Sequence, residues 1–74
     1  MDELLDARGL ACPLPAVKAR GALARVPPGA ALIVLATDPE APVDIGALAA
    51  DAGRAFSAER APDGAWRLVL AAAT

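Results

Sequence analysis

The sequence predicts an α/β (α+β) two-layer sandwich in the order strand-helix-strand-helix-strand-strand, with a four-stranded mixed sheet and two helices on one face. Three observations lead to this prediction. The expected strands are short and largely apolar, each expected helix carries one apolar stripe, and Pro or Gly stands between the elements. A helix with a single apolar stripe buries only that stripe, so both helices are expected to cover the sheet from one side.

The first half of the chain predicts a strand followed by a helix. Residues 3–7 are expected to form the strand, and Arg8-Gly9 ends it. The first helix is expected from Pro13 to about Val26, because proline suits the first helical position and the Pro27-Pro28-Gly29 run breaks a helix. Spacings of three and four residues predict its core stripe. That stripe is Ala16, Ala19, Leu23 and Val26.

The middle of the chain predicts a central strand and a second helix. Residues 30–36 form a continuous apolar run, as expected of a strand paired on both sides. The turn 37–39 leads into a helix over about residues 42–52, with Asp44 in the first turn and Gly53 at the exit. We interpret Asp38 as a turn or cap residue. The expected core stripe of this helix is Ile45, Leu48, Ala49 and Ala52.

The last part of the chain predicts a hairpin. Residues 54–60 and 65–71 are expected to be strands joined by a turn at residues 62–64. Phe56 and Trp66 are the only large rings, and we assign both to the core rather than to a site. With 74 residues, the chain is expected to form one domain, residues 1–74.

Charge and composition exclude several function classes. The net charge of −2 does not favour direct binding to nucleic acid or to an anionic membrane. The absence of histidine removes Cys-His catalysis and most zinc sites, so we expect no metal. The single cysteine excludes an internal disulfide and a CxxC redox pair.

The N-terminal residues and the cysteine count predict a cytoplasmic protein. The first twenty residues carry Asp2, Glu3 and Asp6 and lack a long apolar run, which argues against a signal peptide. No stretch reaches the roughly 18 apolar residues of a membrane span. A lone free thiol fits the reducing cytoplasm.

Cys12 is the predicted working group of the chain. It precedes Pro13 at the expected helix start, where unpaired N–H groups and the positive end of the helix dipole favour an anion. We expect a thiol pKa lowered by less than about one unit, with a further contribution if Arg8 folds back. A sulfur at the cap position could also accept from the N–H of Leu14. Pro13 and Pro15 stiffen the turn that aims the sulfur.

The chemistry of Cys12 is expected to depend on other molecules. Without a second cysteine, the sulfur cannot resolve a mixed disulfide internally, and without histidine no general base titrates near neutral pH. A carrier of a group therefore fits better than a self-sufficient catalyst. Two alternatives stay open at this point. Cys12 could be an inert, buried small hydrophobe, and Arg8 could simply pair with Asp6 or Glu3.

The stretch Asp6-Ala7-Arg8-Gly9-Leu10-Ala11-Cys12-Pro13-Leu14-Pro15 resembles the signature of the TusA (SirA-like) family of small sulfur-carrier proteins. Pro28-Gly29 before the apolar strand, Thr37-Asp38-Pro39 after it and Val43-Asp44-Ile45 at the second helix extend the resemblance over nearly the full length. One departure is the small, alanine-rich segment 46–53, where family members often carry bulkier residues.

The resemblance implies a sulfurtransferase that acts as a carrier together with partner proteins. Cys12 would receive sulfane sulfur from a cysteine desulfurase or a rhodanese-like donor and hold it as a persulfide, with no separate cofactor. A sulfur-acceptor protein of tRNA thiolation, molybdenum-cofactor metabolism or sulfur oxidation would then receive it. The resemblance gives Arg8, Gly9, Pro13, Leu14 and Pro15 supporting roles around Cys12. The candidates for partner docking are Leu14, Val17, Lys18 and Arg25. Lys18 and Arg25 could alternatively be charges on a solvated helix face.

Other functions remain as alternatives. A regulatory or adaptor module with an incidental cysteine would bind its partners equally well without the thiol. A relative that handles thiosulfate or selenium, paired with a membrane transporter, would share the thiol chemistry. An RNA-binding role is disfavoured by the negative charge and by the near absence of aromatic side chains.

Overall fold

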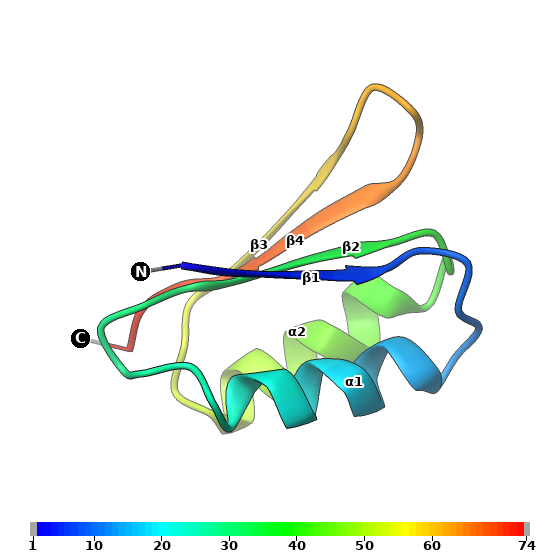
Figure 1. Ribbon diagram of the computed structural model, residues 1–74. Coiled ribbons are helices and arrows are strands. Elements are labelled where there is room, and N and C mark those ends of the chain that lie inside the picture. Colours follow the sequence, from blue (N-terminus) through cyan, green and yellow to red (C-terminus); the bar gives the residue numbers. More distant parts are fainter. Residues whose placement is uncertain (1, 74) are drawn as a thin grey trace.

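The computed structural model describes residues 2–73, which form six elements. Two helices lie on the same face of a four-stranded sheet (Figure 1), as predicted. The elements are β1 (Glu3–Ala7), α1 (Leu14–Leu23), β2 (Leu32–Ala36), α2 (Ala41–Asp51), β3 (Phe56–Arg60) and β4 (Trp66–Leu70).

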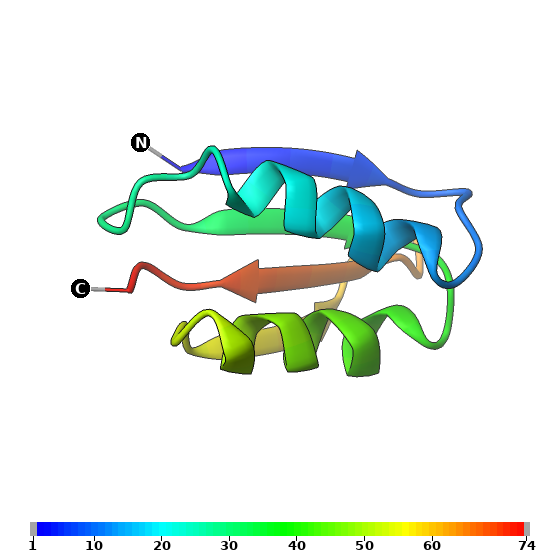
Figure 2. The ribbon, with the colours of Figure 1, turned by 90° about the horizontal axis from the view of Figure 1, so that it is seen from below.

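The sheet is mixed and has the strand order β1-β2-β4-β3. β1 pairs parallel with β2, whereas β2–β4 and β4–β3 are antiparallel. The continuous apolar run is thus a central strand with a neighbour on each side, which confirms the prediction. Figure 2 shows α1 over the β1–β2 half of the sheet and α2 over the β4–β3 half.

The core lies between the sheet and the two helices. Alternate residues of the central strands point into this layer, since successive side chains of a strand face opposite sides. Leu32, Val34, Leu68, Leu70 and Ile45 of α2 are fully buried there. No helix of residues 2–73 lies on the other face of the sheet in Figure 1, and Leu4 on it is exposed.

The helical stripes differ in part from the prediction. α1 begins at Leu14 and ends at Leu23, earlier than expected, because the backbone continues in tight turns in which Val26 N–H bonds to the Leu23 carbonyl. Ala52 lies past the end of α2 and is exposed, so its assignment to the core was wrong. Residues buried without having been predicted are Pro15, Ala22 and Ala41.

The hairpin and its aromatic residues follow the prediction with shorter strands. Phe56 and Trp66 are half-buried and pack against the core. α2 approaches β3 closely at Gly46, where a Cβ atom would lie 3.2 Å from the Phe56 ring. The guanidinium of Arg60 stacks on Trp66, 4.2 Å from the ring centroid. The hairpin turn bends away from the helix layer (Figure 1).

Arg54 is a buried cation that the sequence analysis did not single out. Its side chain is 8% exposed and donates to carbonyl oxygens where the end of α1, the start of β2 and the end of β4 meet. The acceptors and distances are Ala30 (2.6 Å), Pro27 (3.2 Å), Ala71 (3.2 Å) and Val26 (3.4 Å). Arg54 therefore supplies donors to four carbonyls at the end of the domain remote from Cys12, of which the Pro27 carbonyl also accepts from the Ala30 N–H.

Candidate functional site

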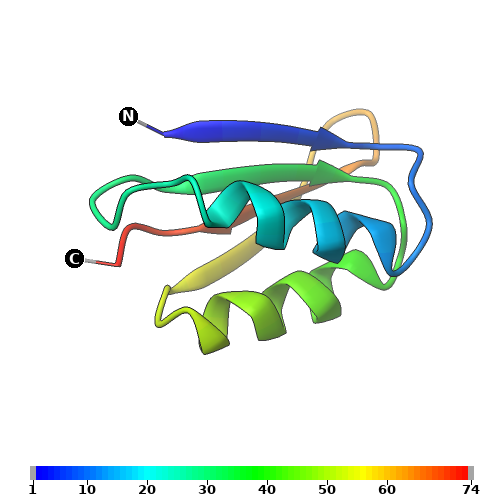
Figure 3. The ribbon, with the colours of Figure 1, turned by 60° about the horizontal axis from the view of Figure 1, so that its bottom comes forward.

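The site lies at one edge of the sheet, where two loops meet. Residues 8–13 connect β1 to α1, and residues 37–40 connect β2 to α2. Because β1 and β2 are parallel, both loops leave the sheet at its same end, and Figure 3 shows them side by side. This topology brings Cys12 close to residues almost thirty positions later in the chain.

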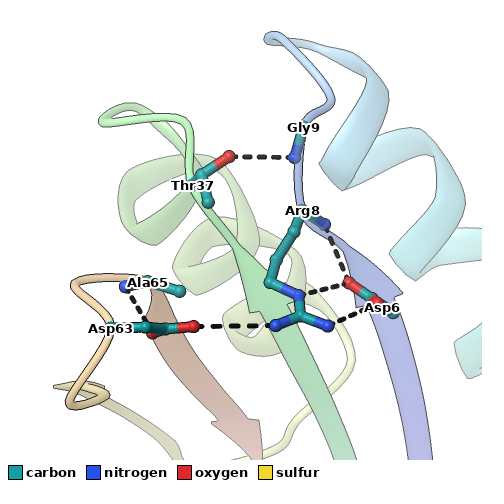
Figure 4. A network of polar contacts seen from close by, with 6 residues as sticks. All are labelled: Asp6, Arg8, Gly9, Thr37, Asp63 and Ala65. Atoms are coloured by element: carbon teal, nitrogen blue, oxygen red, sulfur yellow. Dashed lines mark hydrogen bonds and ion pairs between the residues drawn. The ribbon is translucent and has the colours of Figure 1, made fainter.

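Gly9 joins the two loops through its backbone. Its φ of +82° is a conformation that glycine adopts at little cost, and its N–H donates to the Thr37 hydroxyl oxygen at 2.9 Å (Figure 4). The path of the loop toward Cys12 therefore follows from the turn at Gly9 and its bond to Thr37.

Asp38 fixes the backbone at Cys12. One carboxylate oxygen accepts from the Cys12 N–H at 3.0 Å, and the other accepts from the Glu40 N–H at 2.7 Å. The second contact is the turn arrangement expected of Asp38. The first contact was not foreseen, and it ties the cysteine loop to the turn after β2.

The Cys12 side chain is exposed and contacts α2. Its Sγ–H donates to the Asp44 carboxylate, with 3.0 Å between Sγ and Oδ2. The exposure overturns the alternative of an inert, buried cysteine. Sequence analysis placed Asp44 in the first turn of the second helix but missed that it faces Cys12.

The acidic surroundings make the thiol less acidic, so the expected lowering of its pKa was wrong. The Asp44 hydrogen bond, partial desolvation and the charges of Asp44, Asp38 and Glu40 raise the pKa of Cys12 from 9.0 to about 11. A helix dipole acts as roughly half a unit charge, which is less than these nearby carboxylates provide. In the free protein, these surroundings keep the thiol protonated at neutral pH.

The start of α1 does little to offset the effect of these carboxylates on the pKa of Cys12. Pro13 caps the helix without a side-chain hydrogen bond, and the N–H of Leu14 bonds to the Ala11 carbonyl rather than to sulfur. The expected acceptance from Leu14 was therefore wrong. Pro15 is fully buried against the core, so it anchors the first turn of α1 while Cys12 remains outside.

Arg8 supports the loop and does not contact the thiol. Its guanidinium makes a two-bond contact with Asp6, with both distances 2.9 Å, and lies 3.6 Å from Asp63 in the hairpin turn (Figure 4). These hydrogen bonds lower the pKa of Asp6 to about 2, and the Asp6 contact raises the pKa of Arg8. The sequence left open whether Arg8 folds back toward the thiol or pairs with Asp6 or Glu3, and the pairing with Asp6 is confirmed.

The docking candidates fall into two groups. Leu14 and Val17 are 49% and 48% exposed in the first turns of α1, at the Cys12 end. Lys18 is also exposed, whereas the exposed Arg25 lies past the opposite end of α1 and donates to the Gly21 carbonyl. The structure therefore does not bring Arg25 to the thiol.

A groove of about 310 Å³ runs between α1 and α2 and begins beside Cys12. Its lining combines small apolar side chains with charged ones, a composition that differs from the purely apolar core below it. The lining residues are Pro13, Ala16, Val17, Arg20, Asp44, Ala47, Leu48 and Asp51. The groove gives an approaching side chain a path to the Asp44 carboxylate.

Two further observations concern residues 2–73 as a whole. No group of three or more cysteine and acidic side chains in this part of the chain is arranged to hold a metal ion. None of its helices has the length and apolar character needed to cross a membrane.

Comparison with known proteins identifies relatives along nearly the full chain. The sequence model of the family described as "Sulfurtransferase TusA" matches residues 3–71. A protein of Neisseria meningitidis serogroup A, named as a putative sulfur carrier, is 43% identical over 68 residues, which cover 92% of each chain. The sulfur carrier protein TusA of Allochromatium vinosum is 35% identical over 69 residues, covering 93% of this chain and 91% of that protein.

The fold is shared with a solved structure. The SirA-like protein of Desulfitobacterium hafniense superposes with a TM-score of 0.86 over 100% of both chains, at 23% sequence identity. This likeness extends to the whole two-layer arrangement of helices and sheet.

Proposed function

Because the chain belongs to the TusA family of sulfurtransferases, we propose that it carries sulfane sulfur as a persulfide on Cys12 and relays it between proteins. The observation that supports this assignment most strongly is the position of Cys12. The only thiol of the chain is exposed at the sheet edge, on a loop that Gly9 and Asp38 fix to the rest of the domain.

The proposed loading step is a sulfur transfer between thiols. Cys12, as the thiolate, attacks the terminal sulfur of a persulfide on the donor protein. A bond forms between Sγ and that sulfur, the S–S bond of the donor breaks, and the donor cysteine leaves as a thiolate. The proton released by Cys12 ends on the donor thiolate, so no net oxidation or reduction occurs.

The donor proposed is a cysteine desulfurase or a rhodanese-like enzyme, and the recipient is a sulfur-acceptor protein. Unloading reverses the roles, since the acceptor thiolate attacks the outer sulfur on Cys12. The recipients implied by the family are proteins of tRNA thiolation, molybdenum-cofactor metabolism or sulfur oxidation. Sulfurtransferase activity would then require both partners, because the raised pKa leaves little free thiolate on the carrier alone.

The proposed docking surface surrounds the Cys12 end of the helix layer. Leu14 and Val17 expose apolar side chains beside the groove, and Lys18 adds a positive charge on the same helix. The lone thiol also supports a location in the cytoplasm, where the reducing environment keeps it from forming disulfides.

The test is mass spectrometry after incubation with a sulfur donor. A cysteine desulfurase with cysteine, or a rhodanese with thiosulfate, is expected to add about 32 Da to the protein, and a thiol reductant is expected to remove it. Cys12→Ser is the matched control, since it retains the shape of the side chain and lacks the thiol. No adduct on the wild-type protein with either donor would contradict the proposal.

A further inference from the structure

We propose that Asp44 is a positioning residue that holds Cys12 as a protonated thiol in the free protein, and that a sulfur-donating partner activates Cys12 by bringing a cationic side chain to Asp44. This inference rests on the proposed carrier function and extends it to the charge of the partner. It concerns a residue on α2, outside the motif that contains the cysteine.

The contact itself favours the thiol over the thiolate. At 3.0 Å, Sγ can donate its hydrogen to Oδ2 of Asp44, and only the protonated sulfur has a hydrogen to donate. A thiolate at the same place would face a carboxylate without any shared proton. The Asp44 side chain therefore opposes ionisation both by hydrogen bonding and by charge.

The other charged groups near Cys12 do not offset Asp44. Asp38 and Glu40, in the turn before α2, add negative charge and also act to raise the pKa of the thiol. Arg8 points to Asp6 and Asp63 instead. Arg20 of α1 lines the same groove, yet the ion pairs found among residues 2–73 do not include one between Arg20 and Asp44.

No backbone N–H in the first turn of α1 donates to the Cys12 sulfur. Pro13 and Pro15 have no N–H, and the Leu14 N–H already bonds to the Ala11 carbonyl. The activating positive charge would then come from outside this chain. The groove that begins at Pro13 and Asp44 is open to a partner side chain such as Lys or Arg.

A partner cation at Asp44 would change both the hydrogen bond and the charge that oppose ionisation of Cys12. It would donate hydrogen bonds to the Asp44 carboxylate, which frees the thiol hydrogen, and its positive charge would stabilise the thiolate that forms. Sulfur transfer would then be confined to encounters with a partner of suitable charge. In the free protein, the same contact would protect Cys12 from reacting with small thiol reagents.

The first experiment measures alkylation of Cys12 by neutral iodoacetamide as a function of pH. In Asp44→Asn, we expect the midpoint of the rate profile to shift down by one pH unit or more. For each unit by which the pKa of Cys12 falls, the alkylation rate at pH 8 should rise about threefold. The larger thiolate fraction outweighs the lower nucleophilicity of a thiolate with a lower pKa. Glu3→Gln, which removes one negative charge at the far end of β1, is the matched control and should leave the profile unchanged.

The second experiment uses the wild-type protein and two small reagents of opposite charge. Aminoethyl methanethiosulfonate is a cation and sulfonatoethyl methanethiosulfonate an anion. Each forms a disulfide with the Cys12 thiolate and releases methanesulfinate. For each target, the rate with the cation is divided by the rate with the anion. We expect this ratio to be about fivefold higher for Cys12 than for a free cysteine peptide. Asp44→Asn should lose most of this preference.

An unchanged pH profile in Asp44→Asn, or equal relative rates for the two charged reagents on the wild-type protein, would overturn the inference. Circular dichroism checks that Asp44→Asn is folded, and if it is not, the reagent preference of the wild-type protein decides alone. Neither experiment contains a sulfur donor. A failure of persulfide loading would therefore count against the proposed function, and these rates would still report on Asp44.

Discussion

The backbone N–H of Cys12 donates to the Asp38 carboxylate across 3.0 Å, which joins the loop after β1 to the turn after β2. The same carboxylate accepts from the Glu40 N–H at 2.7 Å. One side chain thus holds the backbone of the reactive residue and the entry to α2 together.

Asp38→Ala should destabilise the protein by about 1–2 kcal/mol, because two backbone donors lose their charged acceptor. Urea unfolding followed by circular dichroism measures the change. Glu59→Ala, which removes an exposed carboxylate paired with Arg67, should change stability by no more than about 0.5 kcal/mol. Equal losses in the two variants would show that the Asp38 contacts do not stabilise the loop.

Gly9→Ala should destabilise the protein by about 1 kcal/mol or more, since alanine disfavours the φ of +82°. A Cβ at Gly9 would have no atom within 4 Å, so the effect would come from the backbone conformation alone. Gly21→Ala is the matched control, because Gly21 lies inside α1 and a Cβ there also meets open space. It should stabilise the protein by about 0.5–1 kcal/mol. Thermal unfolding measures both variants, and midpoints that shift in the same direction in Gly9→Ala and Gly21→Ala would contradict this account.

Arg54→Ala should destabilise the protein by about 3 kcal/mol, because a buried guanidinium that serves four carbonyl oxygens would be lost. Arg54→Lys should recover only part of the loss, since an ammonium group lacks the planar fork that reaches several acceptors. Arg20→Ala, at an exposed arginine of α1, should be close to neutral. Full stability of Arg54→Lys in urea would argue against the geometric role.

Stability should fall as pH rises from about 9 to about 11, in part because of Cys12. The ordinary thiol pKa is 9.0 and the folded value is about 11, so the unfolded chain releases this proton first. The folded state then binds more protons, and ionisation favours unfolding across that window. Cys12→Ser should show a smaller decline in urea midpoint between pH 8.5 and 10.5. Parallel declines in both proteins would refute a raised thiol pKa.

The element order and the position of the helices follow from local patterns. Proline and glycine mark the ends of the elements, and the apolar run that became β2 predicted a central strand. Such signals extend over neighbouring residues, so they can be read directly. The end of α1 was placed too late because Val26 continues the helical spacing of the apolar stripe and directly precedes Pro27, although Val26 is buried outside the helix.

The charges around Cys12 could not be predicted from neighbouring residues in the sequence. The helix dipole at Cys12 depends only on the helix that follows it, whereas Asp44 lies 32 positions later and approaches through the parallel pairing of β1 and β2. Nothing in the spacing of the two residues predicts their contact. Arg54 was likewise predicted only as part of a strand, because its four acceptors come from two distant segments of the chain, residues 26–30 and Ala71.

Both ends of the described chain meet the segment between α1 and β2. Glu3 N–H bonds to the Ala31 carbonyl, and Ala73 N–H bonds to the Pro28 carbonyl. Figures 1 and 2 show N and C on the side opposite the loop that bears Cys12. A dye, affinity tag or surface linker attached at either end would thus point away from the thiol. Tethered single molecules could be loaded and unloaded with sulfur while their reactive edge faces the solution.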